Sequence, residues 1–114
     1  MTLVCYHGEI PYKINQDRAD EILEVMTNLE HRMIINCIKN ESKSVFQISE
    51  DTGITKSTIY RRIRELNKKK LLILSGEINS HKRKVVKYKS KICKIMVILD
   101  KDMMDVTIFS NLKN

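Results

Sequence analysis

The sequence is poor in the residues that mark several large protein classes. It has no tryptophan, one proline and three glycines among 114 residues, and it contains no glycine-rich nucleotide-binding fingerprint. No apolar run approaches the ~18 residues that cross a bilayer. Residues 1–10 lack the basic start and apolar stretch of a signal peptide. We therefore expect one cytoplasmic domain with no membrane partner, and not a multidomain enzyme.

The cysteines do not form the pattern of a secreted disulfide scaffold. Cys5, Cys37 and Cys93 are odd in number and far apart, so we expect reduced thiols. Cys5 and His7 could share one metal ion, but a third and a fourth ligand are not evident. His31 and Cys37 fall on different faces of a helix. We expect no metal site and no cofactor, with Cys37 and Cys93 as small core residues.

The residue patterns of common catalytic sites are also missing. No serine-histidine-aspartate or cysteine-histidine arrangement is suggested. The paired carboxylates Asp20-Glu21 and Asp100/Asp102 are typical of a helix first turn and a hairpin turn. The sequence therefore predicts that the protein is not an enzyme.

Positive charge is concentrated in the middle of the chain. The net charge is +7, from 21 Lys and Arg against 14 Asp and Glu. Residues 1–54 carry −4 (5 basic, 9 acidic), residues 55–94 carry +12 (14 basic, 2 acidic) and residues 95–114 carry −1 (2 basic, 3 acidic). A local cationic footprint is typical of a protein that binds a polyanion, most often nucleic acid. The alternative is that these charges only solvate the surface.

The spacing of apolar residues predicts two helices in the first half of the chain. Apolar residues recur at intervals of three and four from Ile22 to Ile38, which is an amphipathic stripe. Asp17 is the expected N-cap of the first helix. Asn28 is expected to cap a second helix, which Leu29–Lys39 would fill.

A short helix, a tight turn and a longer helix are expected next. Phe46–Thr52 is predicted to be helical and to end at Gly53, in a turn that needs a positive φ. Thr55 is expected to cap a helix that runs to about Lys69. Three apolar residues spaced by four and three share its buried face: Ile59, Ile63 and Leu66. A strand over Leu71–Leu74, a loop tip at 79–83 and a return strand from Lys84 complete a hairpin.

The C-terminal segment is expected to be a second β-hairpin that needs a covering surface. Ile92–Leu99 is apolar on both faces apart from Lys94, and a last strand with Met104, Val106 and Ile108 follows a turn at 100–102. A 114-residue monomer has little left to cover both faces. We therefore favour a homodimer built from the N-terminal helix, this hairpin or both. The alternative is that helix and hairpin pack within one chain.

The order helix, strand position, helix, tight turn, helix and hairpin is that of a winged helix-turn-helix. Residues 48–74, with the run GITKSTIYRR at 53–62, resemble the helix-turn-helix of prokaryotic winged-helix transcription regulators. These form the broad arsenical-repressor-like and multiple-antibiotic-resistance-like superfamily, and small archaeal regulators are the most similar type. Residues 29–35 resemble the preceding helix, and the likeness covers about 29–91. Two positions depart from the pattern: Thr52 replaces a larger apolar residue, and Lys70 stands where many members have glycine.

The resemblance implies that the helix over 55–69 enters the major groove of double-stranded DNA. At about 100° per residue, the side opposite Ile59 is polar and cationic, and arginine there can donate two hydrogen bonds to guanine. The candidate DNA-binding residues on this helix are Lys56, Ser57, Thr58, Tyr60, Arg61, Arg64 and Lys68. The alternative is that Arg61 and Arg64 only solvate an exposed helix.

The hairpin tip is expected to be the wing and to contact the minor groove or the backbone. Its candidate DNA-binding residues are His81, Lys82, Arg83 and Lys84. The alternative is a flexible charged turn.

Together these features predict an α/β protein, mainly α with a β-wing. The expected division is an N-terminal extension (1–16), in which a strand at Leu3–Tyr6 precedes a break at Pro11, a winged helix-turn-helix domain (17–91) and an added C-terminal β-hairpin (92–114). The predicted function is sequence-specific DNA binding in transcription regulation. The alternatives are a winged-helix protein–protein module and a non-specific chromatin-type DNA binder. The sequence gives no sign of a small-molecule effector.

Overall fold

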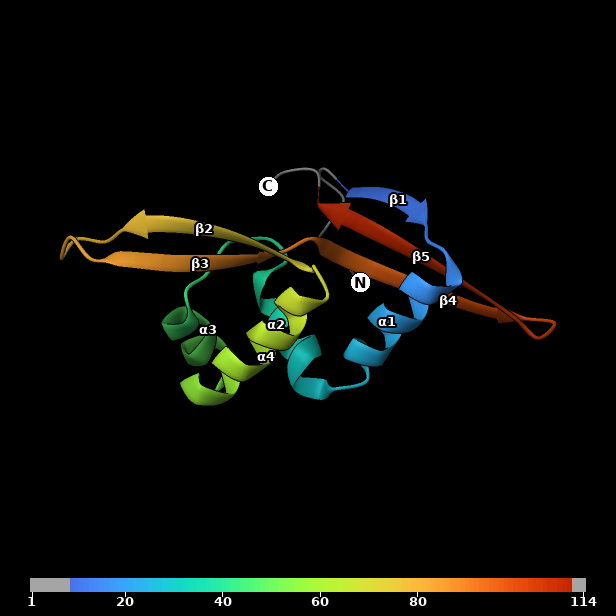
Figure 1. Cartoon of the computed structure of the whole chain (residues 1–114), viewed down its shortest axis with the longest axis horizontal. Helices are drawn as coiled ribbons and strands as arrows, with labels where there is room; N and C mark the ends of the chain where they lie inside the picture. The colour runs from blue at the N-terminus through green and yellow to red at the C-terminus, as the bar shows by residue number, and fades with distance from the viewer. Residues whose placement is uncertain (1–8, 112–114) are drawn as a thin grey trace.

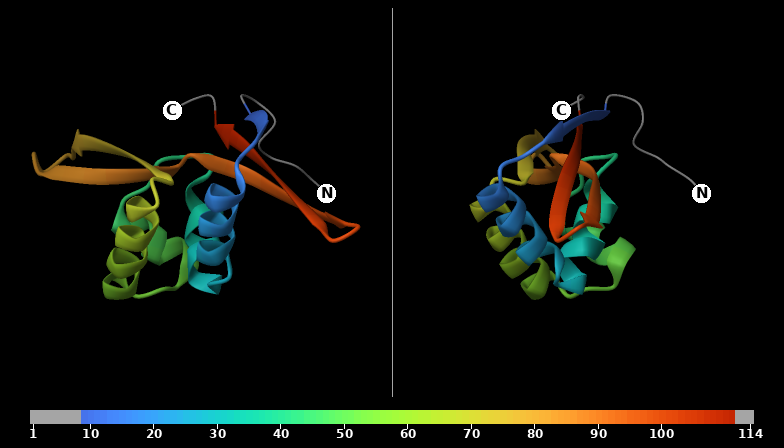
Figure 2. Two further views of the ribbon diagram at one scale, coloured as in Figure 1. Left: turned by 45° about the vertical axis from the view of Figure 1, so that its right-hand side comes forward. Right: turned by 90° about the vertical axis from the view of Figure 1, so that its right-hand side faces the viewer.

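The computed structural model describes residues 9–111 as nine elements. They follow in the order β1 (Glu9–Lys13), α1 (Gln16–Met26), α2 (Leu29–Ile38), α3 (Val45–Thr52), α4 (Lys56–Lys68), β2 (Leu72–Ile78), β3 (Lys84–Ser90), β4 (Ile92–Asp100) and β5 (Met103–Asn111). The fold is mixed α/β, with the four helices gathered on one side of two antiparallel sheets (Figures 1 and 2). The strand expected at Leu3–Tyr6, together with Cys5 and His7, lies outside the described residues.

Side-chain caps determine where the first three helices begin. Asn15, rather than Asp17, caps α1, because its Oδ1 accepts a hydrogen bond from Arg18 N at 2.8 Å. Asp17 instead lies in the first turn, where its carboxylate interacts favourably with the helix dipole. The prediction that Asn28 caps α2 is confirmed, and its Oδ1 accepts from His31 N at 3.2 Å. Ser44 caps α3 in a reciprocal capping box with Gln47.

The turn between α3 and α4 takes the predicted conformation. Gly53 has a φ of +78°, in the left-handed region, and its N–H donates to Ser49 O at 2.9 Å. The Ser49 hydroxyl donates to Ile54 O at 2.7 Å, which fixes the chain as it enters α4. Thr55 is the N-cap of α4, although its side chain makes no capping bond to the backbone. Helix α4 then buries Ile59, Ile63 and Leu66, as the spacing predicts.

Helix α4 is followed by a lysine in a left-handed backbone conformation that usually favours glycine. Lys70 has a φ of +61°, and its N–H donates to Asn67 O at 2.9 Å. Leu71 N donates to Leu66 O at 3.2 Å, so the carbonyls of Leu66 and Asn67 near the end of the helix are satisfied. This is the position where the resembling regulators often carry glycine.

Each of the two sheets contains one hairpin of sequential strands, and β1 is added to the second sheet. Strands β2 and β3 pair alone, and an isolated bridge joins Tyr88 of β3 to Lys43, between α2 and α3. The other sheet has the order β1-β5-β4. Pro11 does not interrupt the chain there, contrary to expectation, because it lies in β1 at a sheet edge, where a missing N–H is tolerated.

The two hairpins extend in opposite directions from a shared core, and the molecule measures 56 × 28 × 26 Å (Figure 1). A single buried cluster joins all four helices to both sheets, and it includes Ile34, Ile48, Ile59 and Ile108. The outer part of the β4–β5 hairpin extends beyond this core. Among residues 9–111 no helix has the length and apolar character needed to cross a membrane.

Candidate nucleic-acid interface

The outer face of α4 carries exposed cationic side chains. Ser57, Arg61, Arg64 and Lys68 are all exposed. No hydrogen bond or ion pair joins Arg61 or Arg64 to another residue within 9–111. Arg61, Arg64 and Lys68 line one shallow depression together with Glu65 and Asn67. Two guanidinium groups are thus presented outward from a rigid helix.

The neighbouring Arg62 is held in the opposite way. Its Nε donates to Glu30 Oε1 of α2 at 2.9 Å, and its Nη1 donates to Glu65 Oε1 at 3.0 Å. These bonds raise the pKa of the guanidinium above its ordinary value and, together with His31, hold the pKa of the Glu65 carboxyl below its ordinary value. Arg62 therefore fastens α4 to α2 and is turned away from the outer face.

A buried histidine joins three helices next to this face. His31 Nδ1 is 2.8 Å from Val25 O at the end of α1, and His31 Nε2 is 2.7 Å from Glu65 Oε1 on α4. The residue is 6% exposed. This bridge and the Arg62–Glu30 pair set the position of α4 on the rest of the domain.

The start of α4 presents hydroxyl groups beside a cation over an aromatic ring. Thr55 Oγ1 donates to Thr58 Oγ1 at 3.1 Å, and Ser57 is exposed next to them. Lys56 Nζ lies 4.9 Å from the centre of the Phe46 ring. Phe46 itself is 57% exposed, although it is a large aromatic residue on the short helix α3. This end of the helix therefore offers both hydrogen-bonding and stacking groups.

A cleft of about 970 Å³ lies between the helices and the β2–β3 hairpin. Its lining comes from α3, α4 and both strands: Ser44, Val45, Phe46, Gln47, Tyr60, Glu77, Asn79, His81, Lys84, Val85, Val86, Lys87 and Tyr88. Burial raises the pKa of the Tyr88 phenol, and the neighbouring Tyr60 adds to this effect. The cleft is therefore aromatic on its helix side and carries two lysines, Lys84 and Lys87, on its hairpin side.

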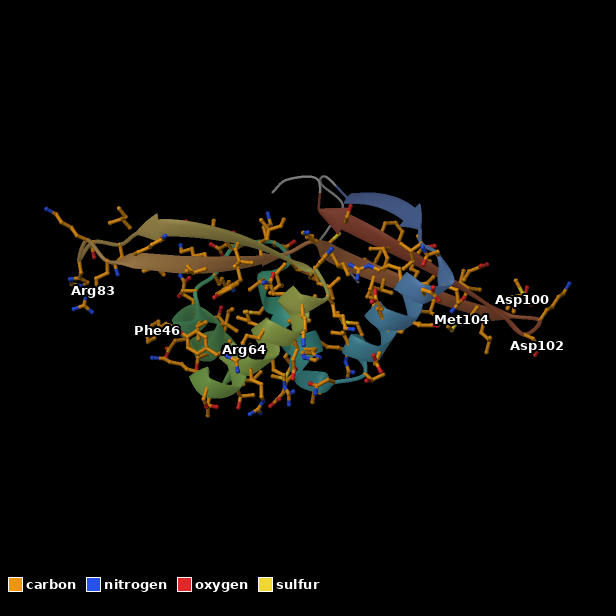
Figure 3. The ribbon with its side chains drawn as sticks, viewed as in Figure 1. Phe46, Arg64, Arg83, Asp100, Asp102 and Met104 are labelled. Carbon is orange, nitrogen blue, oxygen red and sulfur yellow. The ribbon has the colours of Figure 1, made fainter. Side chains whose placement is uncertain are left out.

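The hairpin tip is ordered by one asparagine. Asn79 Oδ1 accepts from His81 N at 2.9 Å and from Arg83 N at 3.0 Å. Asn79 O accepts from Lys82 N, and Asn79 N donates to Arg83 O, both at 2.9 Å. Lys82 has a φ of +60°, and all four residues from His81 to Lys84 are exposed. Figure 3 shows Arg83 at the far end of the hairpin, well away from Arg64 on α4.

The structure does not gather the predicted residues in one place. Tyr60, His81 and Lys84 line the cleft, whereas Arg61, Arg64 and Lys68 lie on the adjacent outer face of α4. Sequence reasoning missed Phe46, Asn79 and the cleft residues of β3 that follow Lys84, namely Val85, Val86, Lys87 and Tyr88. Phe46 carries a detectable signal, because it falls off the inward stripe of Val45 and Ile48 on α3.

Within residues 9–111 no three His, Cys, Asp or Glu side chains are placed to hold a metal ion. Cys93 is buried, as expected of a small core residue. Cys37 is only partly buried, and its Sγ is 3.7 Å from both Lys43 Nζ and Asp51 Oδ2. Burial raises the pKa of its thiol, which disfavours the reactive thiolate.

Comparison with known proteins does not assign this chain to a family. The chain matches no protein-family model, and it has no significant match to a curated protein or to a solved structure.

Proposed function

We propose that this protein is a winged helix-turn-helix regulator that binds double-stranded DNA. Helix α4 is the recognition helix in this proposal, and the β2–β3 hairpin is the wing. The order α2, bridge at Lys43, α3, turn at Gly53, α4 and hairpin supports this assignment. So does the +12 charge of residues 55–94, which span both elements.

The observation that carries the proposal is the contrast between adjacent arginines on α4. Arg62 is fixed by Glu30 and Glu65, whereas Arg61 and Arg64 are directed outward without an ion-pair partner in the described chain. Cations that serve only solubility need no fixed position, whereas Arg61 and Arg64 are carried on a helix that Arg62 and Glu65 anchor to α2. Arginine on a helix of this size suits guanine in the major groove.

In this proposal the cleft between the helices and the β2–β3 hairpin holds one sugar-phosphate strand beside the recognition helix. Lys84 and Lys87 offer charge to phosphates from the hairpin, although Lys87 Nζ also pairs with Glu77 at 3.1 Å. Tyr60 and the exposed Phe46 offer apolar contact to sugars or to thymine methyl groups. Phosphate contacts then supply affinity, and Ser57, Arg61 and Arg64 supply base readout.

Selection of bound DNA from a random pool tests the proposal. A specific regulator enriches a defined sequence, whereas a non-specific chromatin-type binder retains DNA without enrichment. A winged-helix protein–protein module retains no DNA at all.

Two variants then separate base readout from phosphate contact on the enriched sequence. Arg61→Ala is expected to weaken binding by about tenfold and to relax sequence preference, since a bidentate contact contributes about 1–3 kcal/mol of discrimination. Lys82→Ala is expected to weaken binding to all sequences alike. Unchanged affinity for both variants at fixed salt would contradict the proposal.

A further inference from the structure

The outer part of the β4–β5 hairpin is apolar and uncovered within one chain. Strand β1 pairs with β5 only at 107–111, so residues 97–106 form a two-stranded ribbon. Leu99 is 75% exposed and Met103 66% exposed. The other large apolar side chains exposed on this ribbon and at its base are Met96, Val97, Ile98 and Met104. Such an isolated ribbon is marginal in water, and a contiguous apolar patch of this kind marks an association surface.

One face of this ribbon continues directly from the protein core. Ile95, Val97 and Leu99 of β4 pair across the sheet with Ile108, Val106 and Met104 of β5. Ile108 and Val106 are buried near the base, whereas Val97, Leu99 and Met104 are exposed toward the tip. The same apolar face is thus covered by the helices over its inner half and bare over its outer half.

An apolar groove of about 410 Å³ lies at the base of the same hairpin, between α1, α2 and β4. Its apolar lining is Leu23, Met26, Ile35, Ile92, Cys93 and Ile95. Its polar lining is Asn36 and three cations: Arg32, Lys39 and Lys94. None of the groove residues within the described chain is acidic. The groove therefore offers an apolar floor with a cationic rim.

The hairpin tip has the complementary chemistry. Asp100, Asp102 and Asp105 give it a net charge of −2 with Lys101, and they flank the exposed Leu99 and Met103. Figure 3 shows Asp100, Asp102 and Met104 together at the end opposite the cationic tip of the other hairpin. An apolar ribbon with an acidic tip is complementary, in apolar character and in charge, to an apolar groove with a cationic rim.

We propose that two copies of this chain form a two-fold dimer in which each acidic hairpin tip covers the other copy's cationic groove. An antiparallel register about an axis near Met96 puts Asp100 four residues, about 13 Å, from the axis. The two-fold operation brings the partner's Ile92, which lies at the groove, to the same position along the strand, directly opposite Asp100. Both tip–groove contacts then form at once, and the assembly closes as a dimer and does not extend into a filament. The inference stands without DNA binding, since it uses none of the residues on α4 or the β2–β3 hairpin.

Sedimentation equilibrium of the full chain without DNA tests this dimer. The wild type is expected to be a dimer at micromolar concentrations. Leu99→Ser is expected to weaken the dimer by about tenfold or more, because it removes a large apolar side chain that dimerisation would bury. The matched control is Ile78→Ser, which alters an equally exposed side chain (76%) on the other hairpin and should leave the dimer unchanged.

A charge-swap pair tests the specific match of tip and groove. The tip variant is Asp100→Lys with Asp102→Lys, and the groove variant is Lys39→Glu with Lys94→Glu. Each variant alone is expected to dimerise at least about tenfold more weakly than the wild type, whereas an equimolar mixture forms a heterodimer through the restored groove. Circular dichroism establishes that each variant is folded. A monomeric wild type, equal effects of Leu99→Ser and Ile78→Ser, or variants whose association does not change would overturn the proposal.

Discussion

His31 Nε2 of α2 lies 2.7 Å from Glu65 Oε1 of α4, while the other nitrogen of the same ring is bonded to the end of α1. One buried ring therefore joins the two N-terminal helices to the helix that carries the exposed arginines. Glu65 lies beside Arg61 and Arg64, and the three side chains line one shallow depression on α4. The bridge therefore anchors the helix directly next to the arginines that it presents.

Removing the histidine bridge should destabilise the fold without altering charge on the outer face. In His31→Phe, the buried Val25 carbonyl and the Glu65 carboxylate both lose a partner, so the free energy of unfolding should fall by about 2 kcal/mol. Urea denaturation followed by circular dichroism measures this change. The control is Arg61→Ala, which alters an exposed, unbonded side chain and should stay within about 0.5 kcal/mol of the wild type.

Acid should destabilise the protein partly through Glu65. The Arg62 bonds first, and then His31, hold the pKa of Glu65 below its ordinary value. The stability from these bonds is therefore present above the ordinary pKa of glutamate and is lost as the pH falls through the lower folded value. Urea midpoints between about pH 5 and pH 3 should fall in the wild type. They should fall less steeply in Glu65→Gln, and identical slopes would show that Glu65 contributes nothing.

The turn between α3 and α4 should tolerate only glycine well. Gly53 has a φ of +78° with open space around it, so Gly53→Ala costs backbone strain alone, about 1–2 kcal/mol. Gly76→Ala is the matched control, because its new Cβ would meet only the flexible Lys84 Cε at 3.3 Å. Thermal unfolding should distinguish the two variants, and an equal melting temperature would contradict the strain argument.

The order of the hairpin tip should depend on Asn79. In Asn79→Ala the amides of His81 and Arg83 lose the Oδ1 acceptor, so their protection from hydrogen exchange should drop. Each of the two amides loses one hydrogen bond that orders the tip before DNA binds. DNA affinity should therefore fall by up to about tenfold. If exchange quickens while affinity is unchanged, the ordered tip does not contribute to binding.

Local chemistry made much of this fold predictable. The expected helix over 55–69 is α4 at 56–68 with its N-cap at Thr55, because the spacing of Ile59, Ile63 and Leu66 admits only one buried face. The turn at Gly53 was also predictable from local chemistry, because its positive φ favours glycine. Asn15 was missed as the cap of α1 because Asp17, two residues later, has equal intrinsic preference for that role.

Long-range contacts were not accessible from the sequence. The Arg62–Glu30 pair and the His31–Glu65 bridge join residues more than 30 positions apart, and no local pattern specifies them. The cleft was missed for the same reason, since Phe46 and Val86 come together only when the β2–β3 hairpin folds beside α3. The outer half of the C-terminal hairpin is exposed within one chain, so the chain itself does not supply the cover that the apolar pattern of Ile92–Leu99 calls for.

The salt dependence of DNA affinity, measured for two matched lysine variants, tests the proposed interface most directly. Lys82 and Lys101 occupy the turns of opposite hairpins, both with positive φ (+60° and +51°), so Ala imposes the same backbone change on each. For Lys82→Ala the slope of log affinity against log salt should become shallower by about 0.9, the value for one phosphate contact. Lys101→Ala should leave the slope unchanged. Equal slopes for the wild type and both variants, or no salt dependence at all, would contradict DNA binding through α4 and the β2–β3 hairpin.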